Sequence, residues 1–470
     1  MPILIYNSLS QKKEELIPLD PKGKIIKMYS CGVTVYDQCH IGHARSLFVF
    51  DVIRRYLKYR GFDVRFVRNI TDVDDKIIQR ANELHKTSHD VSESNIVLYY
   101  ADMKSLGIDK ADSEPKATEN IPDMVKHIEG LIKQGCAYAA DGDVYFSVRQ
   151  FPQYGKLSGQ SIEKMLEAVR IEKDSKKKDP LDFALWKKSK EGEPSWPSPW
   201  GPGRPGWHIE CSCMSLKHLQ CETLDIHAGG RDLIFPHHEN EIAQSEALTH
   251  QPFAKYWIHH GLLTINGQKM AKSLGNFITV QDALKKYGVD DLKMFFLFSH
   301  YASAIDYTDE KMEEARKALQ RFDILFWKAY EILQGQTIAG EGAADFITKH
   351  KQRFITAMDD DFNTPEALAC LFDLINATNK FISERQNDKN YPAVIYQAVD
   401  IIEDLAGNIF GLFSNEPETD LSTKEQELLE QRKTARANKN FKKSDELRDL
   451  LRQKGIAVED TKAGQTWRKL

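Results

Sequence analysis

Residues 29–43 read Tyr-Ser-Cys-Gly-Val-Thr-Val-Tyr-Asp-Gln-Cys-His-Ile-Gly-His. The apolar run at 25–29 just before them predicts a buried strand. Residues 44–59 carry apolar side chains at three- and four-residue spacing, which predicts a helix, and Gly61 stands where helices commonly end. Residues 62–66 then alternate like a second strand. The order strand, loop, helix, strand is typical of one half of a doubly wound nucleotide-binding sheet.

The loop of this unit places two histidines, His40 and His43, at the start of the predicted helix, with Gly42 between them. Glycine lets the backbone approach a ligand closely, and free N–H groups at a helix N-terminus favour phosphate. Two imidazoles there could stabilise charge that develops as a phosphoryl bond breaks. For one histidine alone an ordinary surface loop would be the better interpretation, but this tetrapeptide at a strand-to-helix turn favours a phosphate site.

His40-Ile41-Gly42-His43 resembles the HIGH signature of class I aminoacyl-tRNA synthetases. The resemblance extends to Cys31-Gly32, to residues 34–37 and to residues 39–45, which are similar to the version found in cysteinyl-tRNA synthetases. Members of that family commonly carry proline where this chain has Val33, a departure that changes loop rigidity and removes no chemical group.

The resemblance covers nearly the whole chain and implies an α/β fold: a class I synthetase Rossmann-like nucleotide-binding domain with a connective insertion, followed by an α-helical bundle and a small C-terminal anticodon-recognition domain. A stretch rich in Pro, Gly, Ser and Trp before residue 207 and a polar linker at 414–420 favour internal boundaries. The expected parts are Rossmann half 1 with the HIGH motif (1–111), the connective insertion (112–206), Rossmann half 2 and a stem-contact region with a KMSKS-like motif (207–307), the helical bundle (308–413) and the anticodon-recognition domain (421–470).

One pair of candidate metal ligands shares a predicted helix face. His237 and Glu241 are four residues apart, a spacing that suits two ligands of one metal. The pair alone is a weak signal, because such pairs often form surface ion pairs. The resemblance implies one bound Zn²⁺, held by Cys31, Cys211, His237 and Glu241. Spacing alone could not choose Cys211 over Cys213, or join Cys31 to the set.

Zinc in such a site would suit the selection of a thiol. An open coordination position could take the sulfur of substrate cysteine as a thiolate, whereas serine offers a harder and far less acidic oxygen. Pocket size alone separates near-isosteres by only about 10–200-fold, so metal ligation would make an editing domain unnecessary. The alternative is a purely structural zinc with four filled positions. The resemblance also implies that Gly32, Thr71 and Trp207 line the cysteine pocket.

A second signature follows a predicted tight turn at Asn266-Gly267. Residues 269–273 read Lys-Met-Ala-Lys-Ser, and two lysines on a glycine-flanked loop could clamp a triphosphate. A basic surface loop is the ordinary alternative. The segment resembles the KMSKS signature, with Ala271 in place of serine, which removes one hydroxyl contact and leaves both lysines. We therefore expect tuning of activity and not its loss.

The resemblance assigns the remaining active-site roles. The expected catalytic residues are His40, His43, Lys269 and Lys272. The expected ATP-binding residues, with Mg²⁺ accompanying the nucleotide, are His40, Gly42, His43, Gly229, Gly230, Asp232 and Lys272, of which Gly229, Gly230 and Asp232 come from a predicted glycine-rich turn at 228–232.

Composition sets broad limits. The chain has 470 residues, with 41% hydrophobic and 28% charged, as in ordinary globular proteins. It contains no apolar run long enough for a bilayer, and its N-terminus lacks the features of a signal peptide. Seven cysteines, an odd number, argue against a disulfide framework, so we expect a cytoplasmic protein. The net charge of −5 counts weakly against nucleic-acid binding. Local patches of basic residues are a better guide to such binding than the total charge.

The last fifty residues are locally basic. Nine Lys and Arg residues stand between positions 432 and 454, against three acidic ones. A helix of this kind could lie on a phosphate backbone, and a solvated helix face is an equally good alternative. Trp467 could stack on an unpaired base. The resemblance implies an anticodon-recognition domain, in which the candidates for tRNA contact are Arg432, Arg436, Asp460 and Trp467.

The resemblance implies a member of the cysteinyl-tRNA synthetase family, which activates L-cysteine with ATP and transfers it to the 3′ end of tRNA(Cys). The expected partners are ATP, L-cysteine and tRNA(Cys), without a membrane, and we expect a monomer. One rival is an ATP-dependent ligase that joins cysteine to a small amine, against which the basic C-terminal segment argues. The other is a non-catalytic zinc protein that binds RNA, against which the intact HIGH motif and both lysines argue.

Overall fold

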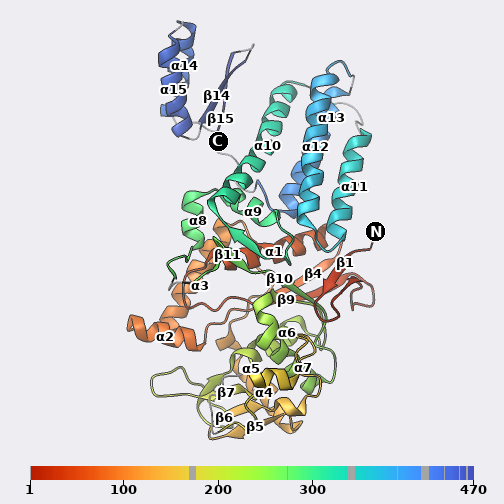
Figure 1. Ribbon diagram of the computed structural model, residues 1–470, viewed down its shortest axis with the longest axis vertical. Helices are drawn as coiled ribbons and strands as arrows, with labels where there is room; N and C mark the ends of the chain where they lie inside the picture. The colour runs from red at the N-terminus through yellow and green to blue at the C-terminus, as the bar shows by residue number, and fades with distance from the viewer. Residues whose placement is uncertain are drawn as a thin grey trace.

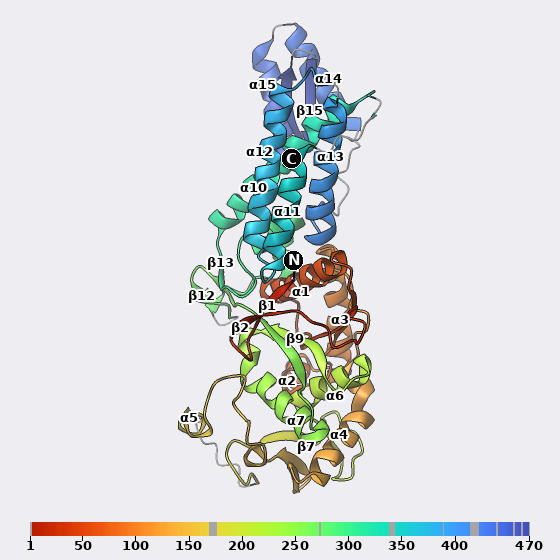
Figure 2. The ribbon, with the colours of Figure 1, turned by 90° about the vertical axis from the view of Figure 1, so that its right-hand side faces the viewer.

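The structure is a computed structural model that describes residues 2–168, 176–271, 274–336, 338, 344–388, 390–413, 423–438, 440–454, 456–461 and 464–469. Figure 1 shows the parallel sheet near the middle of the long axis, an insertion below it, and the helical bundle and C-terminal elements above it. Figure 2 shows the same order after a quarter turn, so the arrangement does not depend on the view. No helix in the described part of the chain is long and apolar enough to cross a membrane.

The central sheet joins strands from two distant parts of the chain. Its members are β3 (Ile25–Ser30), β4 (Asp63–Arg68), β9 (Leu224–Gly230) and β10 (Ala254–His260). All pair in parallel in the order β10-β9-β3-β4. Tyr29 of β3 lies opposite His227 of β9, so the carboxyl ends of these two strands meet at one edge, where ligands bind in sheets of this kind. The predicted α/β nucleotide-binding fold is confirmed.

Helix α1 (Ile41–Tyr59) connects β3 to β4 and buries its apolar stripe, including Leu47, Phe50 and Ile53. It begins three residues before the predicted start at residue 44, because His40 caps it. Gly61 follows the C-cap with φ of 88°, a left-handed conformation that glycine adopts without steric cost. The predicted unit of strand, loop, helix and strand is therefore present.

The chain between β4 and β9 adds helices and a second, antiparallel sheet. Its helices are α2 (Asp75–Leu84), α3 (Ser88–Ser105), α4 (Ile121–Lys133), α5 (Ile162–Ala168) and α6 (Trp207–Leu219). The sheet order is β5 (Ala137–Ala140), β6 (Asp143–Phe146), β7 (Phe183–Lys188) and β8 (Gly203–Pro205). Apolar side chains of this sheet share one core with α4, α6 and α7 (Glu239–Thr249).

Glu239, the first residue of α7, ties the insertion to the helix that carries a predicted metal ligand. Its carboxylate accepts hydrogen bonds from the backbone N–H groups of Gly155, Leu157 and Ser158, at 2.9, 3.1 and 2.8 Å. Glu239 is fully buried. The insertion is thus packed directly against the site region, and it fixes the start of α7.

The remaining chain leads to the helical end. A small sheet of β11 (Leu263–Ile265), β12 (Gln268–Lys269) and β13 (Ile305–Tyr307) precedes the bundle, and β1 (Leu4–Asn7) pairs with β2 (Lys12–Glu15). The helices are α8 (Val280–Lys286), α9 (Val289–Leu297), α10 (Asp309–Leu333), α11 (Asp345–Asp359), α12 (Thr364–Glu384), α13 (Tyr391–Glu403), α14 (Thr423–Ala437) and α15 (Phe441–Gln453). The final hairpin is β14 (Ile456–Thr461) and β15 (Gly464–Lys469). The short helical turns are η1 (Ala117–Asn120), η2 (Val148–Gln150), η3 (Arg231–Leu233), η4 (Ile234–His238) and η6 (Asp404–Ile409).

Candidate active site

The two histidines of the HIGH motif cap α1 for each other. His43 N donates to His40 Nδ1 at 3.2 Å, and His40 N donates to His43 Nδ1 at 3.4 Å. The rings stack with centroids 3.6 Å apart. A Cβ on Gly42 would lie 2.9 Å from the His40 ring, so the stack requires glycine between the histidines.

This capping fixes the chemistry of both rings. Because each Nδ1 accepts a backbone N–H, each ring carries its proton on Nε2 and presents Nε2–H as its donor. Burial lowers the pKa of His40 to about 4, and burial together with His40 and Lys76 holds the pKa of His43 well below its usual value. The pair therefore offers neutral N–H donors at neutral pH, in place of two positive charges.

The second signature is tied to the same helix start. Ile41 N donates to Ile278 O at 3.1 Å, and Val280 N donates to Cys39 O at 2.9 Å, just beyond the signature loop. Lys269 is exposed at the end of β12. Lys272 and Ser273 lie outside the described residues, so their placement stays a prediction.

Sequence reasoning missed Arg45, which follows the HIGH motif directly. Its side chain is buried and donates to backbone carbonyls of the chain at 261–262 and 301–303. Burial lowers the pKa of Arg45 to about 10, and the guanidinium is still charged at neutral pH. An arginine just after the tetrapeptide was the available signal, but its backbone partners lie too far along the chain for sequence reasoning to find them.

The structure brings the four predicted metal-binding residues together. Cys31 follows β3, Cys211 lies on α6, His237 lies in the turn η4, and Glu241 lies on the first turn of α7. One ligand atom from each falls within 4.8 Å of all the others. Cys213 is buried on α6 and belongs to no such cluster among the described residues, so the structure separates it from Cys211.

The helix that carries these ligands begins later than predicted. Residues from Pro236 were expected to be helical, whereas Ile234–His238 form an irregular turn with Phe235 in an extended conformation, and α7 starts at Glu239. His237 Nε2 nevertheless lies 3.0 Å from Glu241 Oε1, because the turn keeps the two on one side. The contact has no acceptable hydrogen-bond geometry, so His237 Nε2 is a buried nitrogen without a hydrogen-bond partner among the described residues.

The charges in the cluster favour a cation. Burial opposes charge on His237, but Glu241 and Cys211 outweigh it and raise the pKa of His237 to about 10. Burial also opposes ionisation of Cys211, but hydrogen bonding with Cys31 and the nearby His237 lower the pKa of that thiol to about 6. Two sulfurs, an imidazole and a carboxylate form a donor set typical of zinc sites. The residues present therefore fit a zinc ion.

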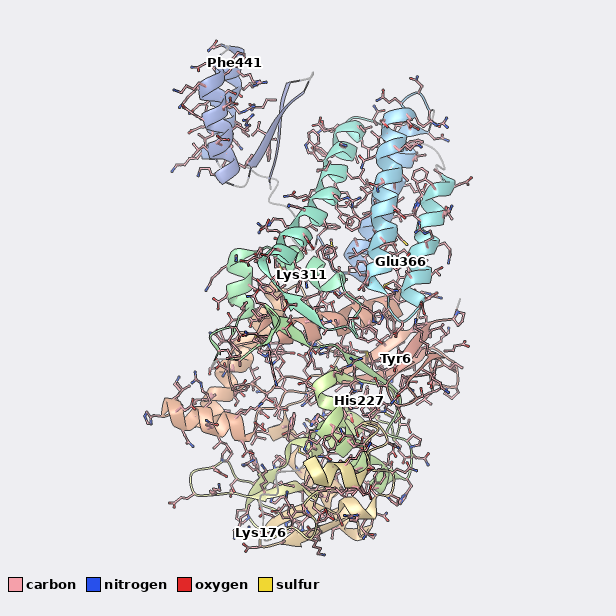
Figure 3. All side chains as sticks on the ribbon, viewed as in Figure 1. Tyr6, Lys176, His227, Lys311, Glu366 and Phe441 are labelled. Carbon is pink, nitrogen blue, oxygen red and sulfur yellow. The ribbon has the colours of Figure 1, made fainter. Side chains whose placement is uncertain are left out.

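Further histidines that sequence reasoning missed surround this cluster. His227 Nε2 lies 2.7 Å from Glu241 Oε2, and His238 Nε2 lies 3.3 Å from Cys31 Sγ, which gives an alternative compact set of Cys31, His227, His238 and Glu241. Figure 3 labels His227 on β9, near α6. His208 Nδ1 lies 2.8 Å from His237 Nδ1. Their adjacency depends on strand order and helix packing, which the sequence pattern does not specify.

The predicted cysteine-pocket residues adjoin the cluster. Gly32 N donates to Asn69 Oδ1 at 2.8 Å, and a Cβ on Gly32 would collide with the Asn69 carbonyl. The Trp207 ring stacks on His237 with centroids 4.1 Å apart and is 38% exposed, so one part of the indole faces solvent. Thr71 is buried and hydrogen-bonded to Asn69 and Glu210.

The predicted adenosine-binding residues are arranged differently from a simple turn. Gly229 and Gly230 end strand β9, and only Asp232 lies in the following turn η3. A Cβ on Gly229 would lie 2.6 Å from the His238 ring, which explains glycine there by close packing. Asp232 is near enough to His40 to oppose the burial effect on its pKa. The carboxyl end of β9 thus approaches the HIGH histidines.

The predicted tRNA-contact residues occupy different environments. Arg432 is fully buried, and its Nη1 donates to Gln465 Oε1 at 2.7 Å, so it joins α14 to the hairpin and presents no surface for a phosphate in this arrangement. Arg436 is exposed on α14. Trp467 is half-buried against the small C-terminal core, and Asp460 pairs with Gln465 in the hairpin.

Family comparisons divide the chain into three matched regions. Residues 19–317 match the model described as tRNA synthetases class I (C) catalytic domain. Residues 353–414 match the DALR domain, and residues 418–468 match the cysteinyl-tRNA ligase anticodon binding domain. The first match alone covers more than half of the chain.

Relatives and solved structures agree with these matches. The chain is 48% identical over 490 aligned residues to the cysteine–tRNA ligase of Persephonella marina and 46% identical over 471 to that of Halalkalibacterium halodurans, in both cases covering 100% of each chain. Among solved structures, Mycobacterium tuberculosis methionyl-tRNA synthetase in complex with methionyl-adenylate shares the fold, with a TM-score of 0.67 and 16% identity over 83% of this chain and 92% of that one. The chain belongs to the cysteine–tRNA ligase family of class I aminoacyl-tRNA synthetases.

Proposed function

We propose that the chain uses the site at the carboxyl ends of β3 and β9 to activate L-cysteine and then charges tRNA(Cys). The cysteine carboxylate attacks the α-phosphorus of ATP, forming cysteinyl adenylate and releasing pyrophosphate. The 3′-terminal adenosine of tRNA(Cys) then attacks the acyl carbon and releases AMP. The observation that carries this proposal is the compact cluster of Cys31, Cys211, His237 and Glu241 beside the HIGH motif.

The cluster would select the substrate side chain. Cys31, Cys211, His237 and Glu241 would hold one zinc ion, which when bound would supply an electrophilic position that prefers a thiolate to the oxygen of serine. The polypeptide supplies the rest of the pocket. Gly32, held by Asn69, and Thr71 form its inner side, and the indole of Trp207 covers the His237 ring.

The two signatures would act on ATP. His40 and His43, whose Nδ1 atoms accept backbone N–H groups, would offer neutral Nε2–H donors to the phosphates. Donors in a fixed position stabilise the charge that develops in the transition state. Lys269 and Lys272 would add positive charge on the opposite side of the triphosphate, with Mg²⁺ bound to ATP. The residues proposed to contact the rest of the nucleotide are Gly42, Gly229, Gly230 and Asp232.

The C-terminal elements would recognise tRNA. Arg436 and the indole of Trp467 are the proposed contacts there, with Asp460 on the same hairpin, and Arg432 would support them from inside the fold. The proposed domain limits are those expected from the sequence: 1–111, 112–206, 207–307, 308–413 and 421–470. We further propose that the protein acts in the cytoplasm as a monomer.

Amino-acid-dependent exchange of pyrophosphate into ATP tests the first step. Exchange should require L-cysteine and should be weaker with L-serine by well over about 200-fold, because pocket size alone supplies only about 10–200-fold. Charging of tRNA(Cys) tests the second step and excludes a ligase that uses a small amine. Exchange that proceeds equally with serine would contradict the proposed role of the cluster.

A further inference from the structure

The chain between α11 and α12 lies where the helical bundle meets the nucleotide-binding end of the molecule. Residues 359–361 are three consecutive aspartates, and Phe362 follows them. Figure 3 labels Glu366 in the first turn of α12, at the lower end of the bundle, and Tyr6 of β1 below it. We call residues 359–362 the junction, because each of its three carboxylates pairs with a different segment outside the bundle.

The first two carboxylates of the junction differ in burial. Asp360 lies at the surface, where its 2.5 Å contact with Lys13 is screened by solvent and contributes little. Asp359 is buried, and its Oδ1 accepts a hydrogen bond from Tyr56 OH at 2.6 Å and pairs with Arg60. Asp359 therefore docks the end of α11 on the C-terminal end of α1, away from the HIGH motif.

Asp361 is the most fully bonded residue of the junction. It is 3% exposed, and its backbone N–H donates to Leu4 O at 2.9 Å. Its Oδ1 accepts from Tyr6 N at 2.8 Å and from Tyr301 OH at 2.7 Å, and its carbonyl accepts from His300 Nε2 at 2.8 Å. This one residue thus ties the bundle to β1 and to the segment at 300–301.

These contacts hold the junction in an unusual backbone conformation. Asp361 and Phe362 have φ of 62° and 53°, in the left-handed region that bulky residues rarely adopt. The Phe362 ring is buried between Tyr56 and Tyr301, with ring centroids 6.2 and 6.4 Å away. Such a conformation persists only where the surrounding structure enforces it. The junction therefore has a single, defined shape against which Tyr301 is held.

Tyr301 carries this contact to the start of α1. Its side chain donates to Asp361, while its backbone carbonyl accepts from Arg45 Nη2 at 3.2 Å and from Gly261 N at 2.9 Å. Arg45 lies two residues after His43, and Gly261 follows β10 directly. Tyr301 is only 4% exposed, so close packing around its ring leaves its backbone little room to shift.

We propose that Asp361 is a positioning residue for the HIGH motif: through Tyr301 it fixes the backbone carbonyls that hold Arg45, and so it couples the helical bundle to the start of α1. The bundle then does more than carry the C-terminal elements, because its junction sets the position of the catalytic signature. The effect on backbone order follows from these contacts alone, whereas the effect on catalysis rests on the proposed function.

Two substitutions break the link without adding backbone strain. Tyr301→Phe removes a single hydroxyl, and Asp361→Gly removes the carboxylate while glycine accepts the positive φ. Asp361→Asn keeps an acceptor oxygen and tolerates the same conformation, so it should restore the link. The matched control is Tyr56→Phe, which removes an equivalent buried bond from tyrosine to aspartate, at Asp359, on the side of the junction away from the HIGH motif.

Hydrogen exchange of the full-length protein, without substrates, measures the link directly. In a peptide that spans residues 261–263, the Gly261 amide reports its bond to the Tyr301 carbonyl. It should exchange about tenfold faster or more in Tyr301→Phe and Asp361→Gly, and within about twofold of wild type in Asp361→Asn and Tyr56→Phe. A peptide from β9 is the internal reference for global stability and should not change.

Cysteine-dependent pyrophosphate exchange measures the consequence for catalysis. Tyr301→Phe and Asp361→Gly should lower kcat by about tenfold, because a small displacement of the reacting groups is costly. The KM for cysteine should change by less than about twofold, since the substitutions leave the predicted cysteine pocket intact. Asp361→Asn should retain kcat, a rescue that mere destabilisation of the bundle would not produce.

The outcomes separate this inference from the proposed function. Unchanged exchange of the Gly261 amide, an equal rise in Tyr56→Phe, an equal rise in the β9 peptide, or normal kcat despite faster Gly261 exchange would overturn it. If Asp361→Gly does not fold, Tyr301→Phe, which removes one oxygen atom, still decides. Absence of cysteine-dependent pyrophosphate exchange in wild type would overturn the proposed function, and the hydrogen exchange would still test whether Asp361 orders the backbone at Gly261.

Discussion

Arg45 Nη1 donates a hydrogen bond of 2.7 Å to the carbonyl oxygen of Gly261, and this contact joins the HIGH helix to the chain that enters the second signature. The same guanidinium donates to the carbonyls of Leu262, at 2.9 Å, Tyr301, at 3.2 Å, and Ser303, at 2.5 Å. A Cβ on Gly261 would collide with the Ser303 carbonyl, so the backbone segments at Gly261 and Ser303 lie in close contact. The distance between the two signatures therefore depends on a side chain outside both of them.

Arg45→Lys should disturb this arrangement although it keeps the charge. Lysine lacks the planar fork that serves several carbonyls at once, and each buried carbonyl left unpaired costs about 1–3 kcal/mol. We expect the free energy of unfolding to fall by roughly that amount and the rate of cysteine activation to fall by about tenfold or more. Denaturant unfolding and pyrophosphate exchange measure the two effects.

The control for Arg45→Lys is Arg55→Lys on the same helix. Arg55 pairs with Asp51 at 2.6 Å and is partly exposed, far along α1 from the HIGH motif. The Arg55→Lys substitution should change the free energy of unfolding little and should leave the rate of cysteine activation unchanged. Normal activation by a folded Arg45→Lys protein would remove Arg45 from the positioning role.

The HIGH histidines should remain neutral over the physiological pH range. An unfolded histidine titrates near about 6.5, whereas burial lowers the pKa of His40 to about 4 and holds that of His43 well below its usual value. Between these limits the unfolded chain binds more protons than the folded one, so their contribution to stability declines as pH falls from about 6.5 toward 4. NMR titration of the histidine rings, assigned with His40→Gln, measures this. A ring signal with a midpoint near 6.5 that vanishes in the variant would contradict the expectation.

The nucleotide fold could be predicted because its signals are local. The apolar spacing of α1, the position of Gly61 and the strand before the loop are all contained in a few adjacent turns. Helix α1 starts earlier than the sequence predicted, because its start depends on His40 and His43 capping each other with their rings. The usual preferences for N-cap residues do not include histidine.

The residues of the metal cluster could not be identified from local sequence patterns alone. Nothing in the spacing distinguishes Cys211 from Cys213, and only the packing of α6 against β4 and α7 brings Cys211 close to Cys31. The resemblance to the family supplied the right set of four residues, whereas His227 and His238 came only from the structure. Arg432 shows that charge patterning can also mislead. It belongs to a basic run that suggested an exposed phosphate-binding face, yet its side chain is fully buried.

Replacing one cysteine of α6 should remove the metal, and replacing the other should not. Cys211→Ser removes a thiolate from the four-residue cluster, and even residues that only support a ligand are worth about 10–100-fold in metal affinity. Cys213→Ser alters a buried side chain outside the cluster and is its matched control. Metal analysis of the purified proteins should find about one zinc per chain in wild type and Cys213→Ser, and far less in Cys211→Ser. Full zinc content in Cys211→Ser would exclude the proposed ligand set.

The C-terminal elements have a core of their own. Leu429, Leu451, Ile456 and Val458 form a separate apolar cluster against which Trp467 packs. Phe441, labelled in Figure 3, marks the start of α15 at the upper end of the molecule, far from His227. Ending the chain after residue 414 should therefore leave cysteine activation intact.

Charging of tRNA(Cys) should respond to three point changes in three different ways. Arg432→Ala leaves Gln465 without its 2.7 Å partner and should destabilise α14 and the hairpin, so charging fails together with the local fold. Arg436→Ala changes an exposed cation and should raise the tRNA KM while reducing its dependence on salt, without unfolding. Trp467→Ala loses packing and roughly 1–3 kcal/mol of base stacking, so its KM should rise with less change in the salt slope. Charging kinetics at two salt concentrations, with circular dichroism of each variant, distinguish the three.

Equal charging by wild type and the chain ended after residue 414 would show that these elements bind no tRNA, and the small-amine ligase would then be the function to test.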